Sequence, residues 1–156
     1  MVSKPLVIGY DGSPASERAI REAAALLAPR SALIVVAWEA GTGFTIAADP
    51  TLMPAPIDIR SALEVDRAMY EHAQLLAQQG ANLASQVGLK AEGLAVADVA
   101  TVAETLLRVA DERDAAAIVV GSHGHNALRE VVLGSTTRDV IKRGERPVVV
   151  VRGSEK

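Results

Sequence analysis

The sequence predicts an α/β fold, an open five-stranded parallel sheet with helices on both faces. Short runs rich in Val, Ile and Leu alternate with longer segments of helical periodicity along most of the chain. Four of the five runs are apolar on both faces. This pattern is typical of a parallel sheet covered on each side, not of a half-exposed antiparallel sheet. We therefore expect right-handed crossovers between the strands.

The five apolar runs are the expected strands. Aromatic residues make up only 3% of the chain, so we expect alanine, valine and leucine to fill the core between the sheet and the helices. The strands are expected at residues 6–10, 33–38, 91–96, 116–121 and 147–151.

Four helices are expected between and after these strands. The first has Ser13 as its N-cap and Pro14 at its first position, where the missing N–H of proline costs nothing. Apolar residues then recur every three or four positions, which predicts a buried helical face. The later helices are expected at residues 61–87, from Val102 to Ala110, and from Ser135 to near Gly144.

Residues 41–60 interrupt the alternation. This segment begins with glycine and contains three prolines, a composition that predicts a long loop, ordered or mobile, after the second strand. Loops of this length inside a compact domain are usually functional or disordered.

Length and composition predict a single domain that spans residues 1–156. The net charge is −3 and the pI is near 5.6, which argues against nucleic acid or a membrane surface as the main partner. The chain contains no cysteine, which excludes disulfides and thiolate chemistry. Neither a signal peptide nor a run of about 20 apolar residues is evident, and we expect a cytoplasmic protein.

The charge is uneven along the chain. Residues 121–156 carry 7 Lys and Arg against 4 Asp and Glu. This excess favours an anionic ligand near the C-terminal part of the fold, although solvated helix and tail charges would give the same count.

Candidate ligand contacts follow the strands, because an open parallel sheet binds ligands outside the carboxyl ends of its strands. Asp11 follows the first strand, and it either caps the next helix or contacts a ribose hydroxyl or a metal-bound water. Trp38 ends the second strand and is either a core ring or a stacking surface for adenine. Asp98 follows the third strand and is expected to be solvated.

The stretch from Gly121 to Thr137 is the strongest candidate for a ligand cradle. Gly121 and Gly124 allow backbone amides to approach a ligand closely. Gly134 and the Ser-Thr-Thr that follows place amides and hydroxyls at a helix start, where the partial positive charge favours phosphate. The alternative interpretation is an ordinary strand-to-helix connection.

Several other functional motifs are absent. The lack of G-x-x-x-x-G-K-[ST] excludes a P-loop NTPase, and the lack of G-x-G-x-x-G after the first strand disfavours a dinucleotide-binding fold. The sequence also has no G-x-S-x-G nucleophile elbow. His123 and His125 form an H-x-H pair of the kind that binds metals, but no third ligand is evident.

The motif G-x-x-G-(nine residues)-G-[ST], formed by Gly121, Gly124, Gly134 and Ser135, resembles the ATP-binding motif of the universal stress protein family. The surrounding segments agree: VIGYDGSPASERAI is similar to the start of that family, LIVVAW to its second strand, ADERDAAAIVVGSHG to its approach to the motif, and LGSTTRDVIKRGERPVVVVR to its ending. The resemblance covers nearly the whole chain except residues 41–60.

The resemblance implies the strand order 3-2-1-4-5 and a Rossmann-like sheet that binds an adenine nucleotide between the first and fourth strands. ATP is the leading ligand, with Mg or Mn as a possible companion ion, and AMP or cyclic AMP is the alternative. The implied contacts to adenosine are Tyr10, Asp11, Trp38 and Val120, and those to ribose and phosphates are Gly121, Ser122, His123, Gly124, Gly134, Ser135, Thr136 and Thr137.

The resemblance also implies a homodimer that forms through the fifth strand, residues 147–151. A short apolar strand at a sheet edge has an independent reason to pair with another strand. Three residues depart from the family pattern. Ala116 and Ala100 replace a frequent Asp and Gly and are expected to affect packing only, whereas the bulky Trp38 either narrows the base pocket or stacks on the base.

The family implies a stress-response regulator, and we expect catalysis to be at most slow. The polar groups near the motif, Asp11, His123 and His125, have no evident orienting partner that would make one of them a general base. One alternative is an ATP-hydrolysing or adenylyl-transferring enzyme on the same fold. A receiver domain with Asp98 as phosphoacceptor is disfavoured, because the acidic pair after the first strand and the lysine after the fifth are missing.

Overall fold

A computed structural model describes residues 3–27, 30–52, 58–98, 100–122 and 133–153. The five strands form one sheet in the order β3-β2-β1-β4-β5, and every neighbouring pair is parallel, which confirms the predicted fold class and strand order. The strands are β1 (Leu6–Gly9), β2 (Ser31–Glu39), β3 (Lys90–Asp98), β4 (Ala117–Gly121) and β5 (Val148–Val151).

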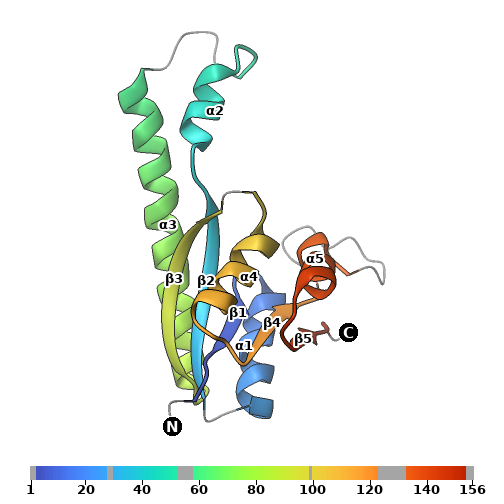
Figure 1. Ribbon diagram of the computed structural model, residues 1–156. Coiled ribbons are helices and arrows are strands. Elements are labelled where there is room, and N and C mark those ends of the chain that lie inside the picture. Colours follow the sequence, from blue (N-terminus) through green and yellow to red (C-terminus); the bar gives the residue numbers. More distant parts are fainter. Residues whose placement is uncertain (1–2, 28–29, 53–57, 99, 123–132, 154–156) are drawn as a thin grey trace.

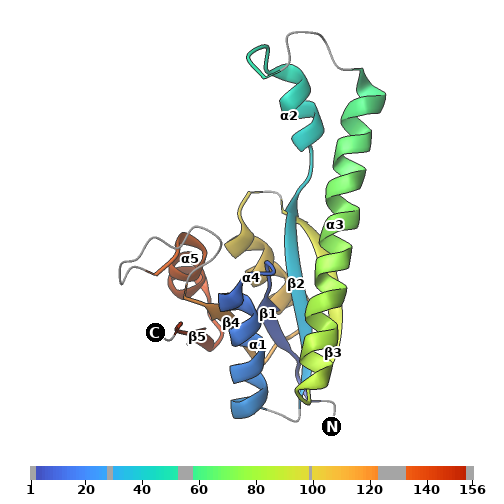
Figure 2. The same cartoon turned by 180° about the vertical axis from the view of Figure 1, so that it is seen from behind.

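Helices cover both faces of the sheet, as Figures 1 and 2 show from opposite sides. One core cluster packs α1 and α3 against one face, and a second cluster packs α4 and α5 against the other. The helices are α1 (Pro14–Leu27), α2 (Thr42–Ala48), α3 (Ile59–Gln86), α4 (Val102–Glu112) and α5 (Ser135–Arg143). None of the helices in the described parts of the chain is long and apolar enough to cross a membrane.

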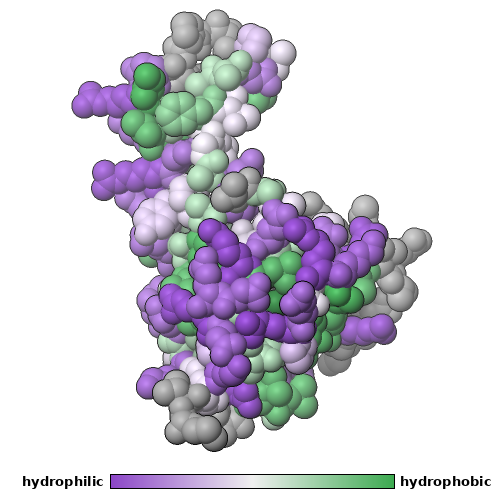
Figure 3. Space-filling view, viewed as in Figure 1, coloured by the Kyte–Doolittle hydropathy of each residue, from purple (hydrophilic) through white to green (hydrophobic). Residues whose placement is uncertain are grey.

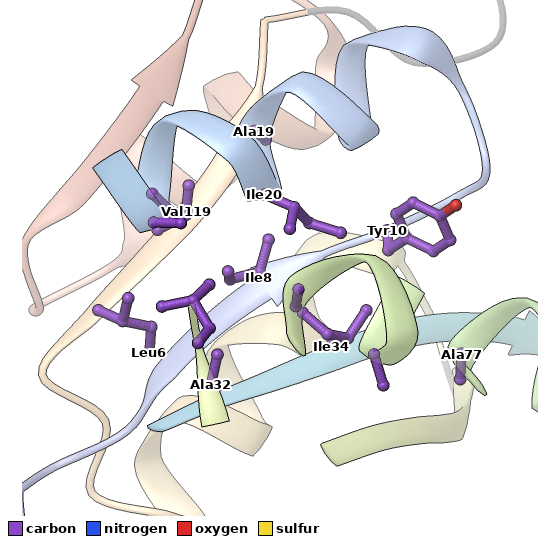
Figure 4. Close-up of a cluster of buried hydrophobic side chains, with 14 of the residues drawn as sticks. Leu6, Ile8, Tyr10, Ala19, Ile20, Ala32, Ile34, Ala77 and Val119 are labelled. Atoms are coloured by element: carbon purple, nitrogen blue, oxygen red, sulfur yellow. The ribbon is translucent and has the colours of Figure 1, made fainter. Parts of the chain in front are cut away.

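Small residues allow close packing between helix and sheet, as the low aromatic content predicts. Figure 4 shows Ile8, Ile20 and Ile34 meeting between the sheet and its covering helices. At Gly80 in α3 there is no room for a side chain, because an added Cβ would lie 2.6 Å from Cγ2 of Ile34 and 2.9 Å from Cδ1 of Tyr10. The position therefore requires glycine although it lies inside a helix.

The segment 41–60, expected to be a loop, is partly helical. Residues 42–48 form α2, and α3 already begins at Ile59. Asp66 of α3 explains the extra helix: its carboxylate accepts hydrogen bonds from the N–H groups of Gly41, at 2.7 Å, and Gly43, at 2.9 Å. A carboxylate at this position satisfies backbone donors that a helix start leaves free.

Together α2 and the first half of α3, residues 59–72, project beyond the sheet (Figure 1). We call this projection the arm. The two helices of the arm pack closely, since Gly43 of α2 lies directly against the backbone of Ala62 in α3. At the base of the arm the rings of Trp38 and Tyr70 lie 5.5 Å apart between centroids, at an angle of 49°.

Candidate functional site

The carboxyl ends of β1 and β4 form the point where the chain turns to opposite faces of the sheet. β1 pairs with β4, and β1 leads to α1 on one face while β4 leads to α5 on the other. Such a switch point leaves a crevice at the edge of an open α/β sheet. The residues that follow these two strands are therefore the ones placed to meet a ligand.

On the β1 side, Asp11 and Ser13 build the turn into α1. The Ser16 N–H donates to Oγ of Ser13 at 3.2 Å, which confirms Ser13 as the N-cap. The Ser13 N–H donates to Oδ1 of Asp11 at 2.9 Å. Gly12 between them has a φ of 78°, a conformation that favours glycine. The carboxylate of Asp11 is thus held in a fixed, half-buried position at the end of β1.

On the β4 side, two hydrogen bonds tie the start of α5 to the end of the strand. The Gly134 N–H donates to the carbonyl oxygen of Ser122 at 2.9 Å, and Oγ1 of Thr137 donates to the carbonyl oxygen of Gly121 at 2.8 Å. The chain that leaves β4 therefore returns to the same place. These bonds bring Gly121 and Gly134 of the predicted motif close together.

Gly121 also lies against the start of α1. A Cβ added at Gly121 would lie 3.1 Å from the carbonyl oxygen of Ala15 and 3.2 Å from its carbonyl carbon. The absence of a side chain at position 121 therefore permits close contact between β4 and α1. The β1–α1 turn and the junction of the end of β4 with the start of α5 are consequently two sides of one site.

The N-terminal end of α5 adjoins this site, because the two hydrogen bonds hold it beside the end of β4. Gly134 is the N-cap and offers no side-chain oxygen to the first N–H groups of α5, and N–H groups at a helix start are donors that can bind an anion. Ser135 is exposed, Thr136 is half-buried, and Thr137 is buried with its hydroxyl bound to β4.

A pocket of about 550 Å³ adjoins the start of α5. It contains two of the predicted phosphate contacts, together with carboxylates at the ends of β2 and β3. Its lining residues are Glu39, Ala40, Asp98, Ala100, Thr101, Val102, Ala103, Ser135, Thr136 and Asp139. The pocket thus has two different sides. The start of α5 favours anions, whereas the carboxylates of Glu39 and Asp98 favour cations or hydrogen-bond donors.

Asp98 is not simply solvated, contrary to the expectation from the sequence. It is half-buried and lies opposite Glu39 in the β2–β3 register. Burial, followed by the charge of Glu39, raises the pKa of the Asp98 carboxyl above its ordinary value. Each carboxylate could be recognised as a residue after a predicted strand, since Glu39 follows 33–38 and Asp98 lies two residues after 91–96.

Three predicted contacts lie mainly in the packing around the site. Tyr10 is 7% exposed and its ring packs on α3, and burial, followed by the charges of Glu17 and Asp11, raises the pKa of its phenol. Val120 faces the α4–α5 core. Trp38 packs on the α1–α3 face against Tyr70, which favours the core alternative for its ring.

His123 and Gly124, together with His125, lie outside the described residues. Glu39, Thr101 and Asp139 line the pocket and were not predicted from the sequence. Thr101 could have been recognised as the N-cap of the helix that follows it. Its Oγ1 accepts the Glu104 N–H at 3.1 Å at the start of α4. Across the described ranges, no group of three or more His, Asp or Glu side chains is arranged to hold a metal ion.

Comparison with known proteins places this arrangement in a family. Residues 3–152 match the model of the universal stress protein family. Universal stress protein MJ0577 of Methanocaldococcus jannaschii is 36% identical over 66 residues, which are 42% of this chain and 40% of that protein. Universal stress protein Rv1996 of Mycobacterium tuberculosis is 32% identical over 149 residues, which are 95% of this chain and 44% of that protein. The chain thus matches less than half of the length of either relative.

Solved structures share the fold over essentially the whole chain. The structure of MJ0577 has a TM-score of 0.77 at 22% identity and covers 100% of both chains. A universal stress protein from Archaeoglobus fulgidus in complex with dAMP has a TM-score of 0.63 at 22% identity, over 97% of this chain and 99% of that one. A universal stress protein in complex with cAMP has a TM-score of 0.66 at 22% identity, over 99% and 100%.

Proposed function

The chain belongs to the universal stress protein family, and we propose that it is a stress-response regulator that binds an adenine nucleotide at the β1–β4 edge. One observation carries the proposal. The hydrogen bonds from Gly134 to Ser122 and from Thr137 to Gly121 hold the start of α5 beside the end of β4. A helix start whose N-cap lacks a side chain is thereby fixed at the switch point of the sheet, where ligands of such folds bind.

The phosphates are assigned to the start of α5. The N–H groups of Ser135 and Thr136 and the hydroxyl of Ser135 supply donors there, and the helix end carries roughly half a positive charge. Gly121 at the end of β4 and Gly134 at the start of α5 have no side chains that would obstruct the phosphates. Ser122, His123 and Gly124 complete the predicted contacts.

The adenosine part is assigned to the β1 side of the same site. Asp11 is fixed at the end of β1 by the Ser13 N–H, and a carboxylate in this position accepts hydrogen bonds from ribose hydroxyls. The family members solved with dAMP and cAMP support an adenine nucleotide as the class of ligand. Tyr10, Trp38 and Val120 are assigned to the supporting wall of this part of the site.

ATP is the leading ligand, and AMP and cyclic AMP are the alternatives. A divalent ion such as Mg²⁺ would bind chiefly through the phosphates, since Mg²⁺ usually takes only one or two protein carboxylates. We propose Asp11, Glu39 and Asp98 as the carboxylates from which such a ligand would come. When bound, the ion would neutralise phosphate charge beside the acidic side of the pocket.

We propose regulation by binding, not rapid turnover, and a homodimer formed through β5. Within the described residues β5 pairs only with β4, so Val148–Val151 form an apolar edge. Such an edge is protected when a second copy pairs with it. Turnover of ATP is expected to be far below about 10 per second, the rate of an ordinary enzyme. Cytoplasmic location stays a prediction from the sequence.

The proposal is tested by placing a negative charge at the start of α5. In Ser135→Asp the carboxylate stabilises the helix start but repels phosphate, so the affinity for ATP is expected to fall at least about tenfold while the fold is kept. Ser61→Asp is the matched control, because Ser61 lies in the first turn of α3, on the arm.

Isothermal titration with ATP, AMP and cyclic AMP measures both variants and the wild type, and mass spectrometry identifies any small molecule that copurifies. Equal affinity of Ser135→Asp and Ser61→Asp for ATP would contradict the assignment of the phosphates. A wild-type protein that binds none of the three nucleotides would contradict the proposed function itself.

A further inference from the structure

The arm presents an apolar patch to solvent. Figure 3 shows this patch over α2 and the adjoining end of α3, with hydrophilic side chains beside it. Phe44 is 44% exposed, Leu63 54% and Ile59 70%. Large apolar side chains gathered at this level of exposure mark an interaction surface more often than an ordinary solvated face.

Two rows of side chains run along the exposed side of α3 in the arm. Ile59, Leu63 and Tyr70 form an apolar row, since residues three, four and seven apart share a face of a helix. Arg60, Glu64, Arg67 and Glu71 form a second row at the same spacing, about 100° further round the helix, and all four are exposed. The apolar row is thus flanked on one side by a charged row.

The charged row alternates in sign, and its four positions are symmetric about the centre of the row. Arg60 and Glu71 lie equally far from the midpoint between residues 65 and 66, and so do Glu64 and Arg67. Reversing the direction of the row therefore converts each charge into its opposite. A row with this property is complementary to a second copy of itself.

We propose that the arms of two copies of this chain pair antiparallel through these two rows. A two-fold axis perpendicular to α3 lays the same flank of each helix against that of its partner. Arg60 then faces the partner's Glu71, and Glu64 faces the partner's Arg67. The apolar rows meet beside the charged ones, as in an antiparallel helix pair in which flanking charges set the orientation.

The charge pattern favours a second copy over a different kind of partner. An acidic or a basic partner would be matched by a row of one sign, whereas this row has two positive and two negative members. The pair of Arg67 and Glu71 within one copy, with Nε and Oε1 2.9 Å apart, is compatible with the contact. In the dimer these two side chains become part of a network of four or more charges.

The arm contact is independent of the nucleotide site and of β5. The pairing segment lies on the part of α3 that projects beyond the sheet, whereas β5 is at the edge of the sheet (Figure 1). If both contacts form, the arms join dimers made through β5 into larger assemblies. Variants of the arm are therefore expected to change the assembly state and leave nucleotide affinity unchanged.

Charge reversal provides the test. In Glu64→Arg the new charge faces the partner's Arg67, and in Arg67→Glu it faces the partner's Glu64, so each variant creates two repulsive pairs per dimer. Self-association through the arm is expected to weaken at least about tenfold in each. An equimolar mixture of the two variants restores all four attractive pairs, so mixed association is expected to return to about the wild-type level.

Sedimentation velocity over a range of protein concentrations measures these assemblies. Glu22→Arg and Arg21→Glu are the matched controls, because they make the same charge changes on exposed positions of α1. Circular dichroism verifies the helix content of each variant. The proposal would be overturned if both arm variants sedimented like the wild type. It would also be overturned if the mixture associated no better than either variant alone.

A second variant tests the apolar row. Leu63→Gln keeps the helix and its charges but removes the apolar contact, and it is expected to weaken the same association. Leu26→Gln is its control, since Leu26 is 69% exposed on α1. If Leu63→Gln and Leu26→Gln sediment alike, the apolar row is not part of an interface.

Discussion

Thr137 in α5 donates its hydroxyl proton to the carbonyl oxygen of Gly121 at the end of β4, at 2.8 Å. The hydroxyl is at the start of a helix and the carbonyl ends a strand, and Thr137 is only 3% exposed. This bond is one of the two that close the β4–α5 connection. It therefore links the stability of the fold to the shape of the proposed phosphate site.

Thr137→Val is expected to lower both stability and nucleotide affinity. Valine has nearly the same shape but leaves the Gly121 carbonyl without this donor, and an unsatisfied buried group costs about 1–3 kcal/mol. Urea unfolding measures the loss, and titration with ATP measures the affinity. Thr137→Ser retains the hydroxyl and is expected to keep most of both. A Thr137→Val protein as stable as the wild type would contradict the role of this hydrogen bond.

Gly80→Ala is expected to destabilise the protein although alanine is the better helix former. In an open helix the change would stabilise by about 0.8–1 kcal/mol. At this position the added Cβ would lie 2.6 Å from Ile34 and 2.9 Å from Tyr10, and overpacking of this kind costs about 1–3 kcal/mol.

The midpoint of thermal or urea unfolding decides between the two effects at Gly80. Gln79→Ala, at an exposed neighbouring position, is the control for helix propensity alone. A higher midpoint for Gly80→Ala than for the wild type would mean that α3 moves away from β2 at little cost.

Local patterns were sufficient to predict most of the fold. The apolar runs identified all five strands, because a strand buried on both faces has few polar residues. Ser13 and Pro14 located the start of α1 because helix starts have their own local chemistry. The strand order, by contrast, came from the family resemblance, since periodicity within a strand does not say which strand lies beside it.

Features that depend on residues far apart in the sequence were not predictable in this way. The α2 helix forms where its start can bind Asp66, which is 25 residues from Gly41. The packing of Trp38 on Tyr70 likewise depends on the placement of α3 against β2. For the same reason, Glu39 and Asp98 could be named as residues after strands, but not as a facing pair with Asp139 nearby.

Asp66→Ala is expected to loosen α2 without unfolding the domain. The carboxylate binds the N–H groups of both Gly41 and Gly43, and loss of a helix cap costs about 0.5–2 kcal/mol. Hydrogen exchange of the α2 amides is expected to accelerate about 2- to 30-fold, because the arm lies outside the sheet and opens locally. Glu22→Ala, which removes an exposed carboxylate of α1 outside the arm, is the control. Unchanged exchange in α2 would show that Asp66 does not hold this helix.

Asp98→Asn is expected to stabilise the protein at neutral pH and to lose this advantage in acid. Because burial and Glu39 raise the pKa of Asp98 in the folded state above the ordinary value of 3.8, the folded protein binds the Asp98 proton more tightly than the unfolded chain does. Stability therefore falls as pH rises through the window between the two pKa values, and the loss is complete above it. Asparagine carries no charge and escapes this loss. The urea midpoint of Asp98→Asn is therefore expected to exceed that of the wild type at pH 7 and to approach it below the ordinary pKa.

Glu39→Gln is expected to shift the urea midpoint in the same direction, because it removes the charge that also raises the pKa of Asp98. Glu112→Gln, at an exposed site of α4, serves as a control. A difference between Asp98→Asn and the wild type that does not change with pH would show that desolvated charge is not the reason.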